Sequence, residues 1–218
     1  MKYYVSTALI CVLLLSACSE EPTSTQPPTT LTPILKVNIQ PDSLDGWLYY
    51  SFDLDSIIPA SQSNTDIWDV KLRYLPYDTT ASGIGNFINV FLNTGPIYFN
   101  SGTVNPNGKT KVAIIDSIFD QLSVVPQESL FLSDDTSSAG RAFKTLQYPN
   151  TIFIYSGPPN HACTFKPNKT VVLRSRSNKY YKVQFLSIYK DAPEQPNTKT
   201  ELGYYRFRYI KADGTRLK

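Results

Sequence analysis

The side chains best equipped for chemistry are scarce in this chain, which has one histidine and three cysteines. The histidine, His161, follows a Gly-Pro-Pro-Asn segment. A single histidine excludes a histidine-rich metal site, and it excludes a Ser-His-Asp array built on any other histidine. A nucleophile elbow, a glycine-rich phosphate loop and a metal-ligand cluster are also absent from the sequence. Asp134 and Asp135 stand among serines and threonines, which indicates a loop rather than a catalytic carboxylate pair. We therefore expect a binding protein and not an enzyme.

The N-terminal segment has the layout of a bacterial secretion signal. Lys2 precedes an apolar run from Val5 to Leu15, which is too short to span a bilayer as a stable helix. The run ends in Leu15-Ser16-Ala17-Cys18, which resembles a lipobox. We expect residues 1–17 to be a lipoprotein signal peptide and Cys18 to carry fatty acyl chains such as palmitate. Several acyl chains on one residue give stable anchoring, since each buried methylene contributes roughly 0.8 kcal/mol.

The other cysteines are then easily assigned. Cys11 leaves with the signal peptide and Cys18 carries lipid, so Cys163 remains alone. One free thiol cannot form an intramolecular disulfide or a four-cysteine zinc site.

The segment after the anchor is expected to be a disordered spacer. Residues 18–33 contain the lipidated cysteine and a stretch of proline, threonine and serine that cannot bury enough surface to fold. Glu20 and Glu21 resemble the acidic signal that sends some lipoproteins to the outer face of the outer membrane. We expect an outer-membrane protein that faces the cell exterior, with residues 34–218 forming a single β-rich domain.

Composition and periodicity favour an all-β fold. Fifteen tyrosines and eleven phenylalanines suit pleated surfaces, and apolar residues alternate with polar ones along several short runs. These patterns predict an antiparallel β-sandwich or barrel-like sheet with at most one or two short helices. Strands are expected at 34–39, 47–54, 67–75, 86–92, 111–116, 151–155, 170–175, 180–189 and 203–210, and a short helix at 117–122. Asn178 is expected to turn the hairpin before the eighth of these strands.

Charge argues against a nucleic-acid partner. The formal net charge is only +3, whereas a dedicated nucleic-acid binder usually shows a strongly basic stripe. Arg174, Arg176, Lys179 and Lys182 are therefore expected to form a solvated sheet face.

An ordered set of short motifs from about residue 47 to the C-terminus resembles the HmuY-like family of bacterial lipoproteins. The motifs are Trp68-Asp69-Val70 with Arg73-Tyr74, Gly83 and Gly85, Phe119–Leu122 with Val125-Pro126, Tyr155–Pro158, Thr164–Arg174, Lys182–Phe185 with Tyr189, and Tyr204–Tyr209. The resemblance implies an all-β fold on the outer membrane that binds haem and hands it to a TonB-dependent receptor for iron acquisition. In the family's best-known members two histidines or two methionines hold the iron. The first of these positions falls on Ser156, and the second lies near 134–148, where this chain has neither histidine nor methionine.

One alternative iron ligand is available in the same loop. His161 lies five residues after Ser156, and a neutral imidazole is a good ligand for haem iron. Tyr155, Tyr148 or Cys163 could supply a second ligand, because phenolate and thiolate both bind ferric iron. Five-coordinate binding through His161 alone, a solvated His161 and a merely buried Cys163 all remain open.

The sequence also offers groups for the rest of a haem pocket. Arg141 and Lys144 could meet the propionates through charge-assisted hydrogen bonds. The competing hypothesis is an accessory lipoprotein of an uptake complex that binds a glycan or a partner protein and no haem. In the glycan version, Trp47, Tyr49 and Tyr50 would stack on sugar rings.

Overall fold

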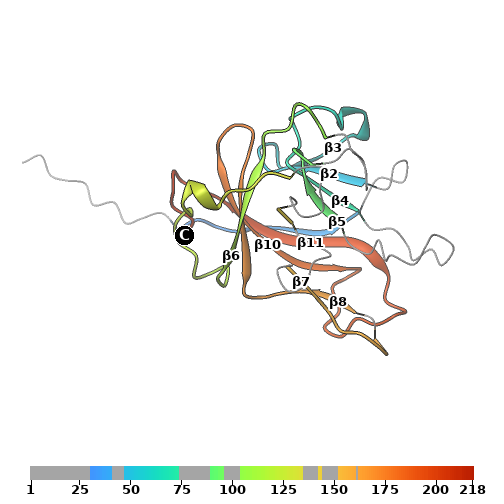
Figure 1. The fold of residues 1–218 in the computed structure, drawn as a ribbon. Helices are drawn as coiled ribbons and strands as arrows, with labels where there is room; N and C mark the ends of the chain where they lie inside the picture. Colours follow the sequence, from blue (N-terminus) through green and yellow to red (C-terminus); the bar gives the residue numbers. More distant parts are fainter. Residues whose placement is uncertain are drawn as a thin grey trace, which may run out of the picture.

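Two antiparallel sheets pack face to face in the computed structural model, which describes residues 30–40, 47–73, 89–95, 104–134, 142–143, 152–160 and 162–218. The larger sheet has the strand order β1-β11-β10-β9-β6 (Figure 1). Its strands are β1 (Ile34–Ile39), β6 (Lys111–Asp116), β9 (Lys169–Arg174), β10 (Tyr180–Tyr189) and β11 (Leu202–Lys211). The smaller sheet has the order β3-β2-β4-β5. Its strands are β2 (Trp47–Ser51), β3 (Ser56–Ile58), β4 (Val70–Arg73) and β5 (Asn89–Leu92).

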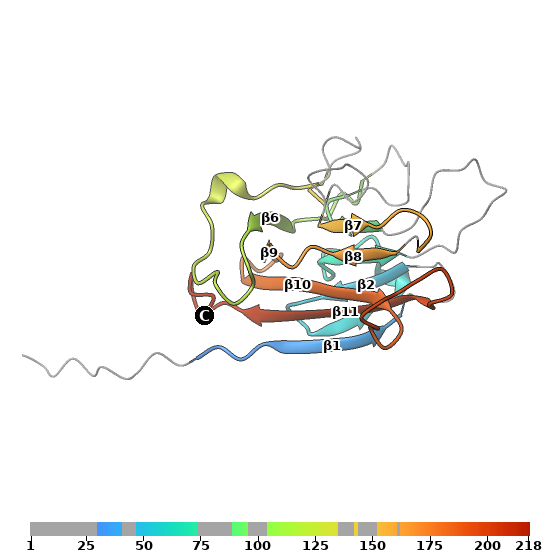
Figure 2. The ribbon, with the colours of Figure 1, turned by 90° about the horizontal axis from the view of Figure 1, so that it is seen from below.

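These sheets confirm the expected all-β sandwich. The only helical elements among the described residues are two single 3-10 turns, Ala60–Gln62 and Glu128–Leu130. No described helix is long and apolar enough to cross a membrane. A separate hairpin, β7 (Phe153–Tyr155) with β8 (Cys163–Phe165), lies beside β10 (Figure 2).

The space between the sheets is filled by aromatic rings. On the large sheet, alternation along β10 and β11 turns Tyr181, Phe207 and Tyr209 inward. Phe52 lies at the centre, with ring centroids 5.9 Å from Phe207 and 5.1 Å from Tyr209. Edge-to-face contacts of this kind stabilise a core beyond the area that they bury.

Both sheets are also covered on parts of their outer faces. On the small sheet the ammonium group of Lys71 lies 4.6 Å from the ring centroid of Trp47 and 5.6 Å from that of Phe91. On the large sheet Lys182 donates a hydrogen bond from Nζ to the carbonyl oxygen of Leu122, 2.9 Å away. Lys71 and Lys182 are each only 1% exposed. The expectation that Lys182 belongs to a solvated face is therefore wrong.

The expected helix at 117–122 is also wrong. The segment forms a turn in which the backbone N–H groups of Gln121 and Leu122 both donate to the carbonyl oxygen of Ile118. Its apolar spacing reflects the burial of Phe119, which is 0% exposed and lies 4.5 Å from Lys182 Nζ and 4.2 Å from Arg208 Cζ. Two cations on one ring hold this turn against the sheet without a helix.

The strands predicted from alternation are mostly found, with shorter ends. β1, β6 and β10 have the predicted bounds, whereas β2 ends at Ser51 and β4 begins only at Val70. Asn178 has the predicted left-handed backbone, with φ at 57°. Asp134 lies in a loop as expected, and it is buried there: it is 5% exposed and accepts hydrogen bonds from the backbone N–H groups of Leu92 and Ala142.

The strand register gives the molecule two distinct ends. Ile34 at the start of β1 pairs with Tyr209 near the end of β11, and the C-terminus lies close to that point (Figures 1 and 2). We call this the proximal end, because the chain from residue 30 enters the sheet there. β10 runs from the proximal end to the loop at 190–201, and β11 returns from that loop to the proximal end. The loop marks the distal end.

Candidate functional site

The β7–β8 hairpin carries the described part of the predicted ligand site. Its strands pair Phe153 with Phe165 and Tyr155 with Cys163. The rings of Phe153 and Phe165 lie 4.5 Å apart, and Phe165 stacks on Phe185 of β10 at 5.4 Å. This aromatic stack fixes the hairpin to the large sheet and orients its loop.

The loop that joins the two strands is closed at its base. Ser156 donates its backbone N–H to the carbonyl oxygen of Ala162 at 2.8 Å, and Ala162 donates its N–H to Ser156 Oγ at 2.9 Å. Gly157 has φ at +69°, a backbone conformation that glycine adopts without strain. The Ser156 hydroxyl therefore closes the loop.

The loop lies at the distal end of the molecule. Cys163 donates its backbone N–H to Tyr189 Oη at 2.9 Å, and Tyr189 is the last residue of β10. Further along β8 the chain moves back toward the middle of β10, where Pro167 accepts a hydrogen bond from Gln184. Residues 157–160 thus lie beyond the end of β10, away from the start of β1 (Figure 2).

The hairpin exposes apolar surface. Ile154 is 46% exposed and Tyr155 is 57% exposed, although neighbouring Phe153 is buried. An exposed apolar and aromatic edge suits one face of a flat, apolar ligand such as a porphyrin. The run of β-branched and aromatic residues at 151–155 was the sequence signal for this strand, but it did not show which residues would face solvent.

The surroundings of Cys163 disfavour its thiolate form. Its side chain packs against the main core, and burial raises the pKa of the thiol to about 11. The neutral thiol is a poor ligand, because the thiolate is the form that binds metal. This favours the interpretation of Cys163 as a small apolar residue.

The other predicted site residues lie outside the described residues. They are Cys18, Arg141, Lys144, Tyr148 and His161. Within the described ranges, no group of three or more His, Cys, Asp or Glu side chains could hold a metal ion. The described residues of the hairpin fit the apolar surface that haem needs, while the predicted iron ligand lies outside them.

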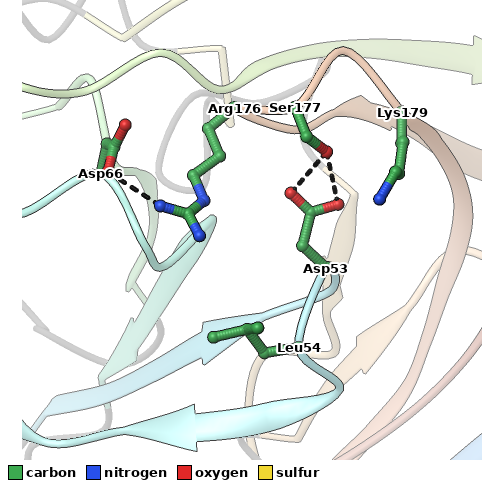
Figure 3. Close-up of a pocket in the computed structure, with 6 residues that line it drawn as sticks. All are labelled: Asp53, Leu54, Asp66, Arg176, Ser177 and Lys179. Carbon is green, nitrogen blue, oxygen red and sulfur yellow. Dashed lines mark hydrogen bonds and ion pairs between the residues drawn. The ribbon is translucent and has the colours of Figure 1, made fainter.

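A second candidate is a polar hollow at the proximal end, with a volume of about 390 Å³ (Figure 3). The β2–β3 turn contributes Asp53 and Leu54, and the β9–β10 turn contributes Arg176, Ser177 and Lys179. Asp66 completes the wall and also lines an adjoining hollow with residues 106–109.

The acids of this hollow are already bound by the protein's own groups. Asp53 accepts hydrogen bonds from Ser175 at 3.0 Å, Ser177 at 2.7 Å and Tyr181 at 2.8 Å. Burial raises the pKa of Asp53, but these hydroxyl donors outweigh it and hold the pKa below its usual value. These hydrogen bonds therefore form a polar clamp that joins the β2–β3 turn to the β9–β10 turn. The geometry of the hollow does not require a ligand.

Asp66 behaves in the same way. It accepts from Lys109 Nζ at 2.9 Å and from Arg176 Nη1 at 3.1 Å. The bond from Lys109 is the main cause of the lowered pKa of Asp66. Neither carboxylate was singled out from the sequence, since their partners lie far along the chain.

The prediction that Trp47, Tyr49 and Tyr50 form an aromatic platform for glycan stacking is wrong. Trp47 and Tyr49 are each 4% exposed and Tyr50 is 1% exposed. Their rings fill the cores on the two faces of β2, so they cannot stack on a sugar.

Solved structures similar to this chain include a lipoprotein and an HmuY analogue. A crystal structure described as a provisional lipoprotein of Bacteroides fragilis is 14% identical, over 82% of this chain and 89% of that one, with a TM-score of 0.39. The apo form of a Tannerella forsythia analogue of HmuY is 15% identical, over 84% of this chain and 97% of that one, with a TM-score of 0.35. The second is of the kind that the sequence motifs resemble. At these identities and TM-scores, neither carries an argument about what this chain binds. No protein-family model and no curated protein matches the chain.

Proposed function

We propose that this chain is a lipid-anchored, non-catalytic binding protein of the outer membrane that captures haem at the distal β7–β8 hairpin. Its acyl anchor would be on Cys18, and the spacer to residue 33 would hold the domain off the membrane. The observation that carries the proposal is the hairpin's position. An exposed apolar edge and a closed loop project from the end opposite the start of β1.

The anchor and the hairpin together suit capture from outside the cell. A chain tied to the membrane before residue 30 presents the start of β1 toward the membrane. The loop between Ser156 and Ala162 then faces the medium, or a partner approaching from it. A TonB-dependent receptor is the proposed partner, on the resemblance to HmuY-like proteins.

The proposed ligand contacts divide by chemistry. His161 would bind the iron, since neutral imidazole is the commonest protein ligand of this kind. Tyr155 would contact the porphyrin face, since Ile154 points to the opposite face of the strand. Arg141 and Lys144 would pair with the propionates. Bound haem would supply the iron cargo, and no reaction of it is required.

A haemin titration tests the proposal. The chain from residue 18, carrying Cys18→Ser to remove the lipid, is titrated with haemin and followed by visible absorption. We expect a saturable shift of the Soret band that is lost in His161→Ala. Tyr155→Phe keeps the ring and removes the phenol, so it tests iron ligation by Tyr155 without removing the apolar contact.

The outcomes separate the alternatives. A Soret shift that survives His161→Ala refutes the ligand assignment but keeps haem binding. A flat titration refutes haem capture and leaves the accessory protein that binds a glycan or a partner. Since Trp47, Tyr49 and Tyr50 are buried, partner binding would then be the better supported form.

A further inference from the structure

The proximal end gathers several segments that are far apart in sequence. The backbone N–H of Leu217 donates to the carbonyl oxygen of Ser123, and that of Val125 donates to Thr215. Ala212 bonds to Tyr180 at the β9–β10 turn. The segments 123–132, 175–180 and 211–218 therefore form one face beside the start of β1 (Figures 1 and 2).

This proximal face carries exposed apolar side chains on loops. Val124 is 58% exposed, Leu130 is 51% exposed and Leu132 is 54% exposed. Ile34, where the chain enters β1, is 41% exposed. Apolar side chains at the tips of loops suit the boundary between lipid headgroups and acyl chains.

The same face has cations that no acid neutralises. Lys211 and Lys218 are exposed, and within the part of the chain that the structure describes no ion pair involves them.

The acids on this face are already held by arginines. Glu128 is held by Arg174 at 2.6 Å and Asp213 by Arg216 at 2.8 Å. Two unpaired lysines, Lys211 and Lys218, beside paired acids leave the face positively charged.

We propose that this proximal face docks on an anionic lipid surface. Charge complementarity and the entry of the chain at this end both favour a lipid headgroup layer as the occupant. A spacer over residues 18–33 reaches at most about 55 Å when fully extended, and a slack spacer permits the contact. Docking would fix the domain upright, with the β7–β8 loop directed away from the membrane. The inference uses the proposed anchor for its orientation and does not depend on the ligand.

Vesicle binding of the unlipidated chain tests this. The Cys18→Ser chain from residue 18 is sedimented with mixed phosphatidylglycerol–phosphatidylcholine vesicles and with pure phosphatidylcholine vesicles. We expect binding to the mixed vesicles only, weakening as salt is added because the Debye length shortens. The double variant Lys211→Gln/Lys218→Gln should lower the partition coefficient about 30-fold, since each lysine near an anionic surface contributes a factor of about five.

A matched double variant provides the control. Lys190→Gln/Lys199→Gln removes the same charge from the distal 190–201 loop and should change vesicle binding less than twofold. Circular dichroism checks that both variants fold. Equal losses in the two variants, or equal binding to the two kinds of vesicle, would refute docking by this face. Binding of haemin without binding of vesicles would support the proposed function and refute the docking face. Binding of vesicles without binding of haemin would support the docking face and refute haem capture.

Discussion

Burial changes the acid-base chemistry of single residues in this fold, and Asp69 is the clearest case. It is 1% exposed, and its carboxylate accepts hydrogen bonds from the backbone N–H of Phe52 at 2.7 Å and from Thr110 Oγ1 at 3.1 Å. Burial outweighs these donors and raises the pKa of Asp69 to about 7. The residue is placed to join β2, β4 and the segment before β6.

This pKa predicts an unusual dependence of stability on pH. Between about pH 4 and about pH 7 the folded protein holds a proton on Asp69 that the unfolded chain releases, so the free energy of unfolding falls as the pH rises through this range. Asp69→Asn cannot titrate and can still accept from Phe52 while donating to Thr110. Urea unfolding at about pH 5 and about pH 8 should show a smaller loss of stability for Asp69→Asn than for the unchanged protein. Equal losses of stability in the two proteins would contradict the prediction.

Cys163 gives a second prediction at the scale of the residue. Burial raises the pKa of its thiol to about 11, so only about one thiol in a thousand is ionised at pH 8. In the Cys18→Ser chain from residue 18 it is the only thiol. Ellman's reagent should therefore react with the native protein at least about 100-fold more slowly than with the protein unfolded in urea. Rapid, stoichiometric reaction of the native protein would show an accessible thiolate and restore Cys163 as a candidate ligand.

At the scale of the element, the β2–β3 turn connects the two sheets through its acids. Asp55 accepts hydrogen bonds from Tyr50 and Tyr209 and an ion pair from Lys36. Asp53 accepts hydrogen bonds from the hydroxyl of Ser177 in the β9–β10 turn (Figure 3). A short turn thus ties β2 to β1, and it ties β2 to β10 and β11 across more than a hundred residues of sequence.

Removing the charge of Asp53 should show how much this connection contributes to the free energy of unfolding. Asp53→Asn loses the charge that organises Ser175, Ser177 and Tyr181, and we expect the free energy of unfolding to fall by about 1–3 kcal/mol. Asp116→Asn breaks an exposed ion pair with Lys169 and should change stability by less than about 0.5 kcal/mol. Chemical denaturation of both variants gives the comparison. A loss for Asp53→Asn no larger than that for Asp116→Asn would show that the turn is not a clamp.

Alternation predicted the strands well, because a strand that packs on a core repeats its apolar residues every second position. It predicted the inward faces of β10 and β11 for the same reason. It could not predict that Asp69, Lys71 and Lys182 are buried, since both sheets are covered on parts of their outer faces. The apolar spacing at 117–122 was taken for a helix, whereas it reflects Phe119 held between Lys182 and Arg208.

The candidate site was less accessible to sequence reasoning. The motif at Tyr155–Pro158 located the β7–β8 hairpin, yet nothing in the sequence placed its loop at the distal end. That position follows from the hydrogen bond that the Cys163 backbone N–H donates to Tyr189 Oη and from the strand pairing of Ile34 with Tyr209. Contacts between residues so far apart in the chain leave no local pattern. The clamp at Asp53 was missed for the same reason.

At the scale of the whole molecule, the order of strands separates the proposed site of attachment from the proposed site of capture. The chain enters at the proximal end, where β1 begins and β11 ends. The exposed apolar hairpin lies at the other end of the same sheet. Under the proposed function, the ligand and the membrane do not compete for one face, because capture and attachment are assigned to opposite ends of the molecule.

Attachment itself gives the last prediction. If Cys18 carries the acyl chains, Cys18→Ser removes the anchor and prevents lipoprotein processing. We expect the unchanged protein in the membrane fraction and the variant in the soluble fraction or as the unprocessed precursor with residues 1–17. The docking face alone should not retain the variant in high salt, since screening weakens its lysines while leaving an acyl anchor intact. Mass spectrometry of the N-terminal peptide checks the modification directly. Processed Cys18→Ser protein that stays on the membrane in high salt would show that this cysteine is not the anchor.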